Sequence, residues 1–187
     1  MSELRIESLV MPAADLGPEN PLPPLLAPRN ASTDSMAIRW EGSAADARTA
    51  AYRTRVSALP HRMQDGFNRV RRERAFRTAV LENEILRATF LLEMGGRLWS
   101  LIHKPTGREL LYVNPIFQPA NLAIRTAWFS GGVEWNCGII GHSVYTCSPL
   151  HAAKVVAPDG TPALRLWEWD RLRGTPYQID FYLPDGM

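Results

Sequence analysis

A short segment in the second half of the chain gathers side chains that are suited to acid/base chemistry on a sugar. It runs from Ala127 to Asn136, is followed by His142, and holds two tryptophans, a Gly-Gly pair and a carboxylate. Glu134 and His142 are the catalytic candidates, because carboxylates and imidazoles commonly transfer protons in enzymes. Trp faces offer flat apolar platforms beside them. The segment therefore predicts a carbohydrate site, with a β-turn that carries two core indoles as the structural alternative.

The two catalytic candidates have different expected roles. Glu134 would act as a general acid if the flanking indoles raise its pKa, and His142 would act as the partner base. The structural alternative for each is a hydrogen-bonded residue at a strand end. The substrate-binding candidates are the neighbouring residues that offer aromatic faces or hydrogen bonds: Arg125, Trp128, Trp135 and Asn136.

The binding candidates carry alternatives of their own. Trp128 and Trp135 would stack on sugar rings or pack in the core, and strict strand geometry places them on opposite faces. The Gly-Gly break between them must therefore re-aim one indole if both are to face a ligand. Arg125 would clamp a carboxylated sugar or pair with Glu134, and Asn136 would bind hydroxyls.

Two cysteines and two histidines have the residue types of a zinc site. They follow one another as Cys137-x4-His142-x4-Cys147-x3-His151. Structural zinc sites normally begin with two close ligands such as C-x2-C, and this spacing lacks such a pair. We therefore expect two free thiols in a reducing compartment and neither a metal nor another cofactor.

Composition bounds the class of protein. The chain has 187 residues, 45% of them hydrophobic, which suits one globular domain, and a formal net charge of +2, which argues against a polyanionic partner. An arginine-dense stretch over residues 48–77 lacks a nucleic-acid-binding motif, so we read it as a solvated loop and edge strand. No apolar run reaches the ~18 residues of a membrane span, and the first residues are unlike a signal peptide. We expect a cytoplasmic protein without nucleic-acid or membrane partners.

Period-two alternation with closely spaced turns predicts an antiparallel all-β fold. Glycine and proline mark the turns, above all at Lys104-Pro105-Thr106-Gly107 and Pro158-Asp159-Gly160. A loop is expected over residues 114–121. The predicted strands cover residues 4–10, 36–40, 76–80, 85–91, 97–103, 108–113, 152–156, 163–169 and 177–183.

The two ends of the chain differ from its centre. Residues 1–58 are expected to hold one N-terminal strand, a proline-rich extended segment over 18–28 and an Ala/Arg-rich segment with a turn of helix near 42–51. Residues 59–187 are expected to form the β-sandwich domain. Pro184-Asp185-Gly186 predicts a further turn, after which Met187 is the last residue. We expect from this that the chain is the N-terminal piece of a longer β domain.

Five short motifs resemble one uncharacterised bacterial family. They combine glycines with charged residues and tryptophan: Leu81-Glu82-Asn83-Glu84, Glu93-Met94-Gly95-Gly96-Arg97-Leu98-Trp99-Ser100, His103-Lys104-Pro105-Thr106-Gly107-Arg108-Glu109, Ser130-Gly131-Gly132-Val133-Glu134-Trp135-Asn136 and Gly141-His142. That family is a domain of unknown function with a galactose-mutarotase-like β-supersandwich, often followed by tetratricopeptide repeats. The resemblance runs from about Leu59 to the C-terminus.

The resemblance to this family implies a function related to carbohydrates. Mutarotase-like domains bind or process carbohydrates on the concave face of a large sheet, and they include aldose epimerases and accessory domains of glycoside hydrolases. It therefore implies a carbohydrate-binding or carbohydrate-processing domain, epimerase-like or glycoside-hydrolase-like, and an isomerase or hydrolase activity when full length. In such epimerases the general base comes from late in the domain, beyond the end of this chain. The alternatives are a non-catalytic glycan- or protein-binding module and an inactive truncated fragment.

Overall fold

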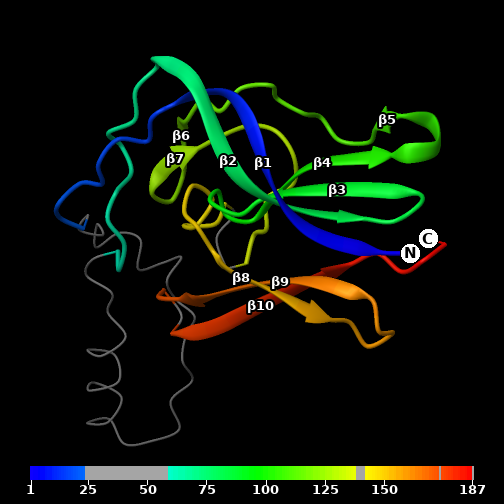
Figure 1. The fold of residues 1–187 in the computed structure, drawn as a ribbon. Helices are drawn as coiled ribbons and strands as arrows, with labels where there is room; N and C mark the ends of the chain where they lie inside the picture. Colours follow the sequence, from blue (N-terminus) through cyan, green and yellow to red (C-terminus); the bar gives the residue numbers. More distant parts are fainter. Residues whose placement is uncertain (24–58, 138–141, 173, 187) are drawn as a thin grey trace, which may run out of the picture.

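The computed structural model describes residues 1–23, 59–137, 142–172 and 174–186, and these form an all-β fold with antiparallel strand pairs (Figure 1). Its one described helical element is a 3₁₀ turn, Lys104–Thr106. The strands, in chain order, are β1 (Glu3–Ala14), β2 (Arg71–Glu82), β3 (Leu86–Leu91), β4 (Arg97–His103), β5 (Arg108–Glu109), β6 (Ala120–Ala123), β7 (Thr126–Trp128), β8 (His151–Val156), β9 (Pro162–Asp170) and β10 (Thr175–Tyr182).

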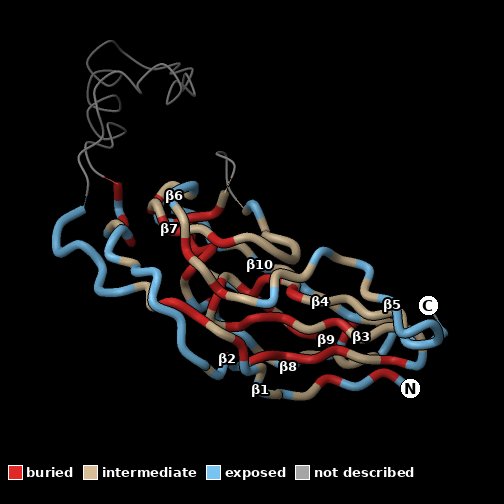
Figure 2. The backbone as a smooth tube through the Cα atoms, turned by 90° about the horizontal axis from the view of Figure 1, so that it is seen from above, coloured by how far each residue is buried: buried red, intermediate tan, exposed pale blue. Residues whose placement is uncertain are grey.

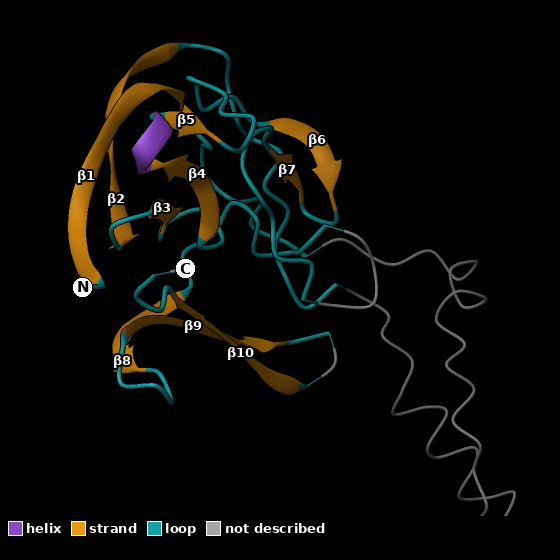
Figure 3. Ribbon diagram, turned by 90° about the vertical axis from the view of Figure 1, so that its right-hand side faces the viewer, coloured by secondary structure: helices purple, strands orange, loops and turns teal. Residues whose placement is uncertain are grey.

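Two facing sheets and one small hairpin make up the architecture. The larger sheet has the order β1-β2-β3-β4-β5, the second has the order β10-β9-β8, and β6 and β7 pair separately. Figure 3 shows the two sheets as separate layers, with β6 and β7 beside the larger one. The predicted all-β sandwich is therefore confirmed.

The larger sheet is covered on both faces. Ala79 and Leu81 of β2 pack toward Leu166 of β9 in one apolar cluster between the sheets. Phe76, on the other face of β2, packs with Phe129 in a second cluster. A strand that is buried on both sides loses its alternation, which explains the unbroken burial from Thr78 to Leu81. Figure 2 shows long stretches of buried residues, in red, in the region of β2, β3 and β9.

Several predicted elements are confirmed and one is wrong. β4 has the predicted bounds, and Pro158-Asp159-Gly160 turns between β8 and β9. The predicted strand over residues 108–113 ends at Glu109, whose carboxylate accepts hydrogen bonds from the amides of Leu101 and Leu111 in place of the strand ladder. The predicted loop over 114–121 is present through residue 119, and β6 begins at Ala120.

The predicted N-terminal strand joins the larger sheet. β1 pairs with β2 along its whole length, from Glu3 opposite Glu82 to Ala14 opposite Arg71. The strand over residues 36–40, the helical turn near 42–51 and residues 24–28 of the proline-rich segment lie outside the described residues, and a division near residue 58 stays a prediction. Within the described ranges, no helix has the length and apolar composition needed to cross a bilayer.

His61 is a buried histidine that packs against Tyr145. It is 5% exposed, and its ring meets the Tyr145 ring edge-on with 5.2 Å between centroids. Burial is the main cause that lowers the pKa of His61 to about 4, and the cations of Arg125 and Arg171 lower it further. The folded protein therefore holds this imidazole in its neutral form.

We expect the free energy of unfolding to fall as the pH is lowered from 6.5 to about 4. In that window the unfolded chain protonates His61 while the folded protein does not, so the unfolded state binds more protons. The shift corresponds to about 3 kcal/mol, which urea unfolding at pH 7 and pH 4.5 would measure. His61→Gln should flatten this dependence, whereas His103→Gln, at a half-buried surface position, should not. An equally steep fall in His61→Gln would contradict the assignment.

Candidate functional site

The turn at Gly131-Gly132 brings the backbone of the 127–136 segment into hydrogen-bonding contact with β4. Gly131 and Gly132 have φ angles of 108° and 63°, a region that side chains rarely adopt. The amide of Val133 donates to the carbonyl of Leu98 at 2.8 Å, and a Cβ on Gly132 would lie 2.2 Å from that same oxygen. Two glycines are therefore required for the backbone to approach β4 this closely, and the approach places Glu134.

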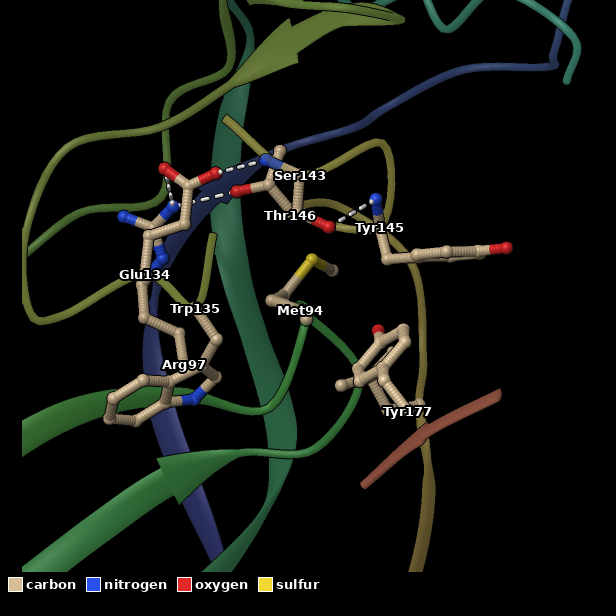
Figure 4. A pocket seen from close by; sticks show the side chains of 10 residues that line it. Met94, Arg97, Glu134, Trp135, Ser143, Tyr145, Thr146 and Tyr177 are labelled. Carbon is tan, nitrogen blue, oxygen red and sulfur yellow. Dashed lines mark hydrogen bonds and ion pairs between the residues drawn. The ribbon is translucent and has the colours of Figure 1, made fainter. Parts of the chain in front are cut away.

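The Glu134 carboxylate is held by four groups, three from residues within nine positions of it and one, Arg97, from β4. Its Oε2 accepts a hydrogen bond from Trp128 Nε1 at 2.9 Å and lies 3.0 Å from His142 Nδ1. Its Oε1 accepts from the amide of Ser143 at 2.9 Å, and Arg97 lies 3.6 Å from Oε2. Figure 4 shows the carboxylate between Arg97 and Ser143. The structure thus brings together Glu134, His142 and Trp128, three of the six predicted site residues.

The electrostatics of Glu134 differ from our expectation. Burial raises its pKa, but the hydrogen bonds from His142 and Trp128, the charge of Arg97 and the Ser143 amide together lower it below the usual range. A general-acid role for Glu134 would need a raised pKa, whereas one of the flanking indoles donates a hydrogen bond that contributes to lowering it. Glu134 is therefore ionised at neutral pH, where it accepts hydrogen bonds and cannot supply a proton.

Arg97 is a site residue that the sequence analysis missed. It is 2% exposed, and its guanidinium donates to the carbonyls of Phe129 and Gly131 at 2.8 and 2.9 Å and to Thr146 Oγ1 at 2.7 Å. It also stacks 3.8 Å from the centre of the Phe129 ring. An arginine that opens an apolar strand directly after Gly95-Gly96 was the available signal, because a buried cation needs a buried partner.

Arg125 lies elsewhere and does not pair with Glu134. Its guanidinium donates to the carbonyl of Arg62 at 2.7 Å and to Ser148 Oγ at 2.9 Å, and it forms an ion pair with Glu19. The predicted pairing with Glu134 is therefore wrong, since Arg97 takes that place. Arg125 ties three chain segments together, and these contacts, rather than a sugar carboxylate, engage its donors.

The remaining binding candidates separate onto two sides of the segment. The rings of Trp128 and His142 meet edge-on with 5.7 Å between centroids. Trp135 points the other way, donates from Nε1 to the carbonyl of Gly96 at 2.8 Å, and packs 4.7 Å from the Phe181 ring in the core between the sheets. Asn136 is exposed at the end of the segment. The Gly-Gly turn therefore does not bring both indoles to one ligand face.

A small pocket lies behind the carboxylate. Figure 4 shows it bounded by the Glu134–Arg97 side and, across from it, by Tyr145 of the turn before β8 and Tyr177 of β10. Its polar lining comes from the groups that already hold Glu134, and its apolar lining includes Trp135, Tyr145 and Tyr177. The pocket therefore connects the candidate site with the space between the two sheets.

The cysteines and histidines of the zinc-like spacing do not form a common cluster in the described residues. Cys147 is buried, which raises the pKa of its thiol to about 12, whereas His151 is exposed on β8. Across the described part of the chain, no three His, Cys, Asp or Glu side chains are placed to hold one metal ion. Nδ1 of His142 instead faces Glu134.

Comparison with known proteins gives a family and a fold. A family model described as a domain of unknown function (DUF5107) matches residues 55–187, more than half of the chain. The crystal structure of a TPR-domain containing protein from Parabacteroides distasonis superposes with a TM-score of 0.74 at 19% sequence identity. The match covers 100% of this chain and 27% of that protein, so the chain spans about a quarter of its length.

Proposed function

The chain belongs to the DUF5107 family of domains of unknown function, and from that premise we propose that it is a carbohydrate-binding domain whose Glu134–His142 pair performs acid/base chemistry on a sugar. The observation that carries the proposal is the 3.0 Å contact between His142 Nδ1 and an ionised, buried carboxylate. The residues that set this contact lie on separate strands and loops, as the parts of a catalytic site usually do.

In this arrangement the imidazole transfers the proton and the carboxylate orients it. Glu134 is 12% exposed and His142 is 36% exposed, so the carboxylate is enclosed while the imidazole reaches solvent. A carboxylate at Nδ1 stabilises the tautomer that carries its hydrogen there, which leaves Nε2 as the proton acceptor. Trp128, edge-on to the imidazole, supplies an adjacent aromatic face.

The backbone at His142 supports a functional role. Its φ of 65° is in the left-handed region, which a side chain other than glycine enters at a cost. Strained residues of this kind concentrate at functional sites, where surrounding contacts hold them in place. The bond from the Ser143 amide to Glu134 is such a contact.

The finer parts of the proposal rest on the sequence resemblance. The sandwich would be the N-terminal part of a galactose-mutarotase-like domain, in a protein that also carries tetratricopeptide repeats, and the full-length protein would be an isomerase or a glycoside hydrolase. The solved protein with this fold supports the association with repeats, because it is a TPR-domain containing protein. A non-catalytic module that binds glycan or protein is the alternative.

We expect Glu134→Gln and His142→Gln each to lower turnover by at least about 100-fold, the usual contribution of a positioned acid or base. The assays are aldose mutarotation followed by polarimetry and hydrolysis of a panel of oligosaccharides, with the full-length protein. Glu93→Gln is the matched control, because Glu93 makes only a 3.7 Å contact with Arg74 at the surface. Full activity in both site variants would overturn the catalytic role, and glycan binding without turnover would favour the non-catalytic module.

A further inference from the structure

A second aromatic surface lies far along the chain from Glu134, on β9. Trp167 and Trp169 alternate with Leu164 and Leu166 of the core, so both indoles project from the face of the smaller sheet that is turned away from the larger one. They are 37% and 51% exposed. Figure 3 shows β8, β9 and β10 as a separate layer with this outer face free of other drawn strands.

Strand register places matching groups beside each indole. Trp167 lies opposite His151 of β8 and Gln178 of β10, and the His151 ring stacks on it at 5.4 Å with a 20° angle between the planes. Trp169 lies opposite Pro176 in the next row. We name this set of five residues the outer platform. It combines flat rings with an amide that can donate and accept hydrogen bonds.

The charges that border the outer platform cancel one another. Arg165, two residues before Trp167 on the same face, donates from Nε and one terminal nitrogen to both oxygens of Asp180, at 2.8 and 2.7 Å. Gln178 donates to the same carboxylate at 3.2 Å. A paired border of this kind attracts neither anions nor cations, so its electrostatic complement is a neutral ligand.

The exposed apolar area also limits the occupant. The two indoles together expose roughly 200 Å², taking ~250 Å² for a whole tryptophan side chain. A specific protein interface buries about 800 Å² on each partner. The two indoles therefore supply only about a quarter of the area that a protein interface needs, whereas a sugar ring is covered by one or two indoles.

We infer that the outer platform is a second carbohydrate-binding surface, which takes a neutral oligosaccharide chain stacked on Trp167 and Trp169. Sugar rings have an apolar C–H face that matches an indole and hydroxyls that match the Gln178 amide and the Arg165–Asp180 pair. Side chains two residues apart on a strand are about 6.6 Å apart, so adjacent indoles contact neighbouring sugar units of one chain. The site does not depend on the chemistry proposed for Glu134 and His142.

Affinity electrophoresis of the whole chain tests this inference. Native gels would contain a neutral β-glucan, a neutral α-glucan or the polyanion alginate, and retardation would give a dissociation constant for each. We expect retardation by at least one neutral glucan and none by alginate. The double variant Trp167→Ala/Trp169→Ala should weaken binding by at least about tenfold, with each single variant in between.

Three controls keep the outcome decisive. Tyr112→Ala removes another exposed aromatic ring, 76% exposed, and should leave retardation unchanged. Glu93→Gln, a surface substitution away from both proposed sites, should also leave it unchanged. Circular dichroism checks that each variant is folded, and glucan-dependent changes in tryptophan fluorescence report on the unmodified protein. Equal retardation of the double variant, retardation by no neutral glucan, or self-association that disappears in the double variant would each overturn the inference.

Discussion

Replacing Arg97 by methionine should destabilise the fold by about 3–5 kcal/mol, the range for removing one partner of a buried ion pair. The substitution keeps the apolar stem but removes the hydrogen bonds to the carbonyls of Phe129 and Gly131 and leaves Glu134 as a buried carboxylate without its cation. Urea unfolding at pH 7 would measure the loss as a lower midpoint.

Two further variants isolate the cause of that loss. Arg74→Met removes an arginine from β2, two strands away in the same sheet, whose 3.7 Å contact with Glu93 is at the surface, and we expect it to cost less than about 1 kcal/mol. Arg97→Met/Glu134→Gln removes both charges, so it should be more stable than Arg97→Met alone. A cost for Arg97→Met as small as that for Arg74→Met would show that the guanidinium does not anchor the site.

Gly132→Ala should destabilise the protein by roughly 3 kcal/mol or more, because it combines backbone strain with a steric clash. The φ of 63° disfavours any side chain, and the new Cβ would lie 2.2 Å from the carbonyl oxygen of Leu98. Relief of the clash must move the turn away from β4, which would also displace Glu134. We therefore expect a lower thermal midpoint together with loss of any activity that depends on Glu134.

Gly107→Ala provides a matched control for the backbone contribution. Its φ of 65° is nearly that of Gly132, and no described atom lies within 4 Å of the position that its Cβ would take. It should cost only about 1 kcal/mol, the penalty of the left-handed conformation itself. The difference between the two variants measures the close approach to β4, and equal losses would contradict that approach.

Many strand positions could be predicted from the glycines and prolines that mark the turns between them. Gly95 and Gly96 precede β4, and Pro105 with Gly107 follow it, so its bounds could be predicted. β5 was predicted too long, because the residues after Glu109 are apolar enough for a strand and only the folded chain shows the Glu109 carboxylate taking backbone amides. Propensity describes a segment in isolation, whereas the length of a strand depends on its neighbour.

The residue types of the candidate site could be predicted from the sequence, but its hydrogen bonds and ion pairs could not. Glu134, His142 and Trp128 lie close enough along the chain for their grouping to be proposed from sequence. Arg97 was missed because charged residues are usually exposed, and its burial follows only from the packing of the 129–131 turn over β4. The direction of the Glu134 pKa followed from the same packing, since the burial that raises it is outweighed by donors brought in from elsewhere.

The sequence by itself determined the all-β class, the positions of most strands, and a Gly-Gly turn that carries a carboxylate near an imidazole. Only the tertiary structure decided that Trp128 joins the site while Trp135 enters the core, and that Trp167 and Trp169 are on the outer face of their sheet. Alternation along a strand separates its two faces but does not say which one is covered. That choice depends on sheet packing, because a face is buried only where another layer lies against it.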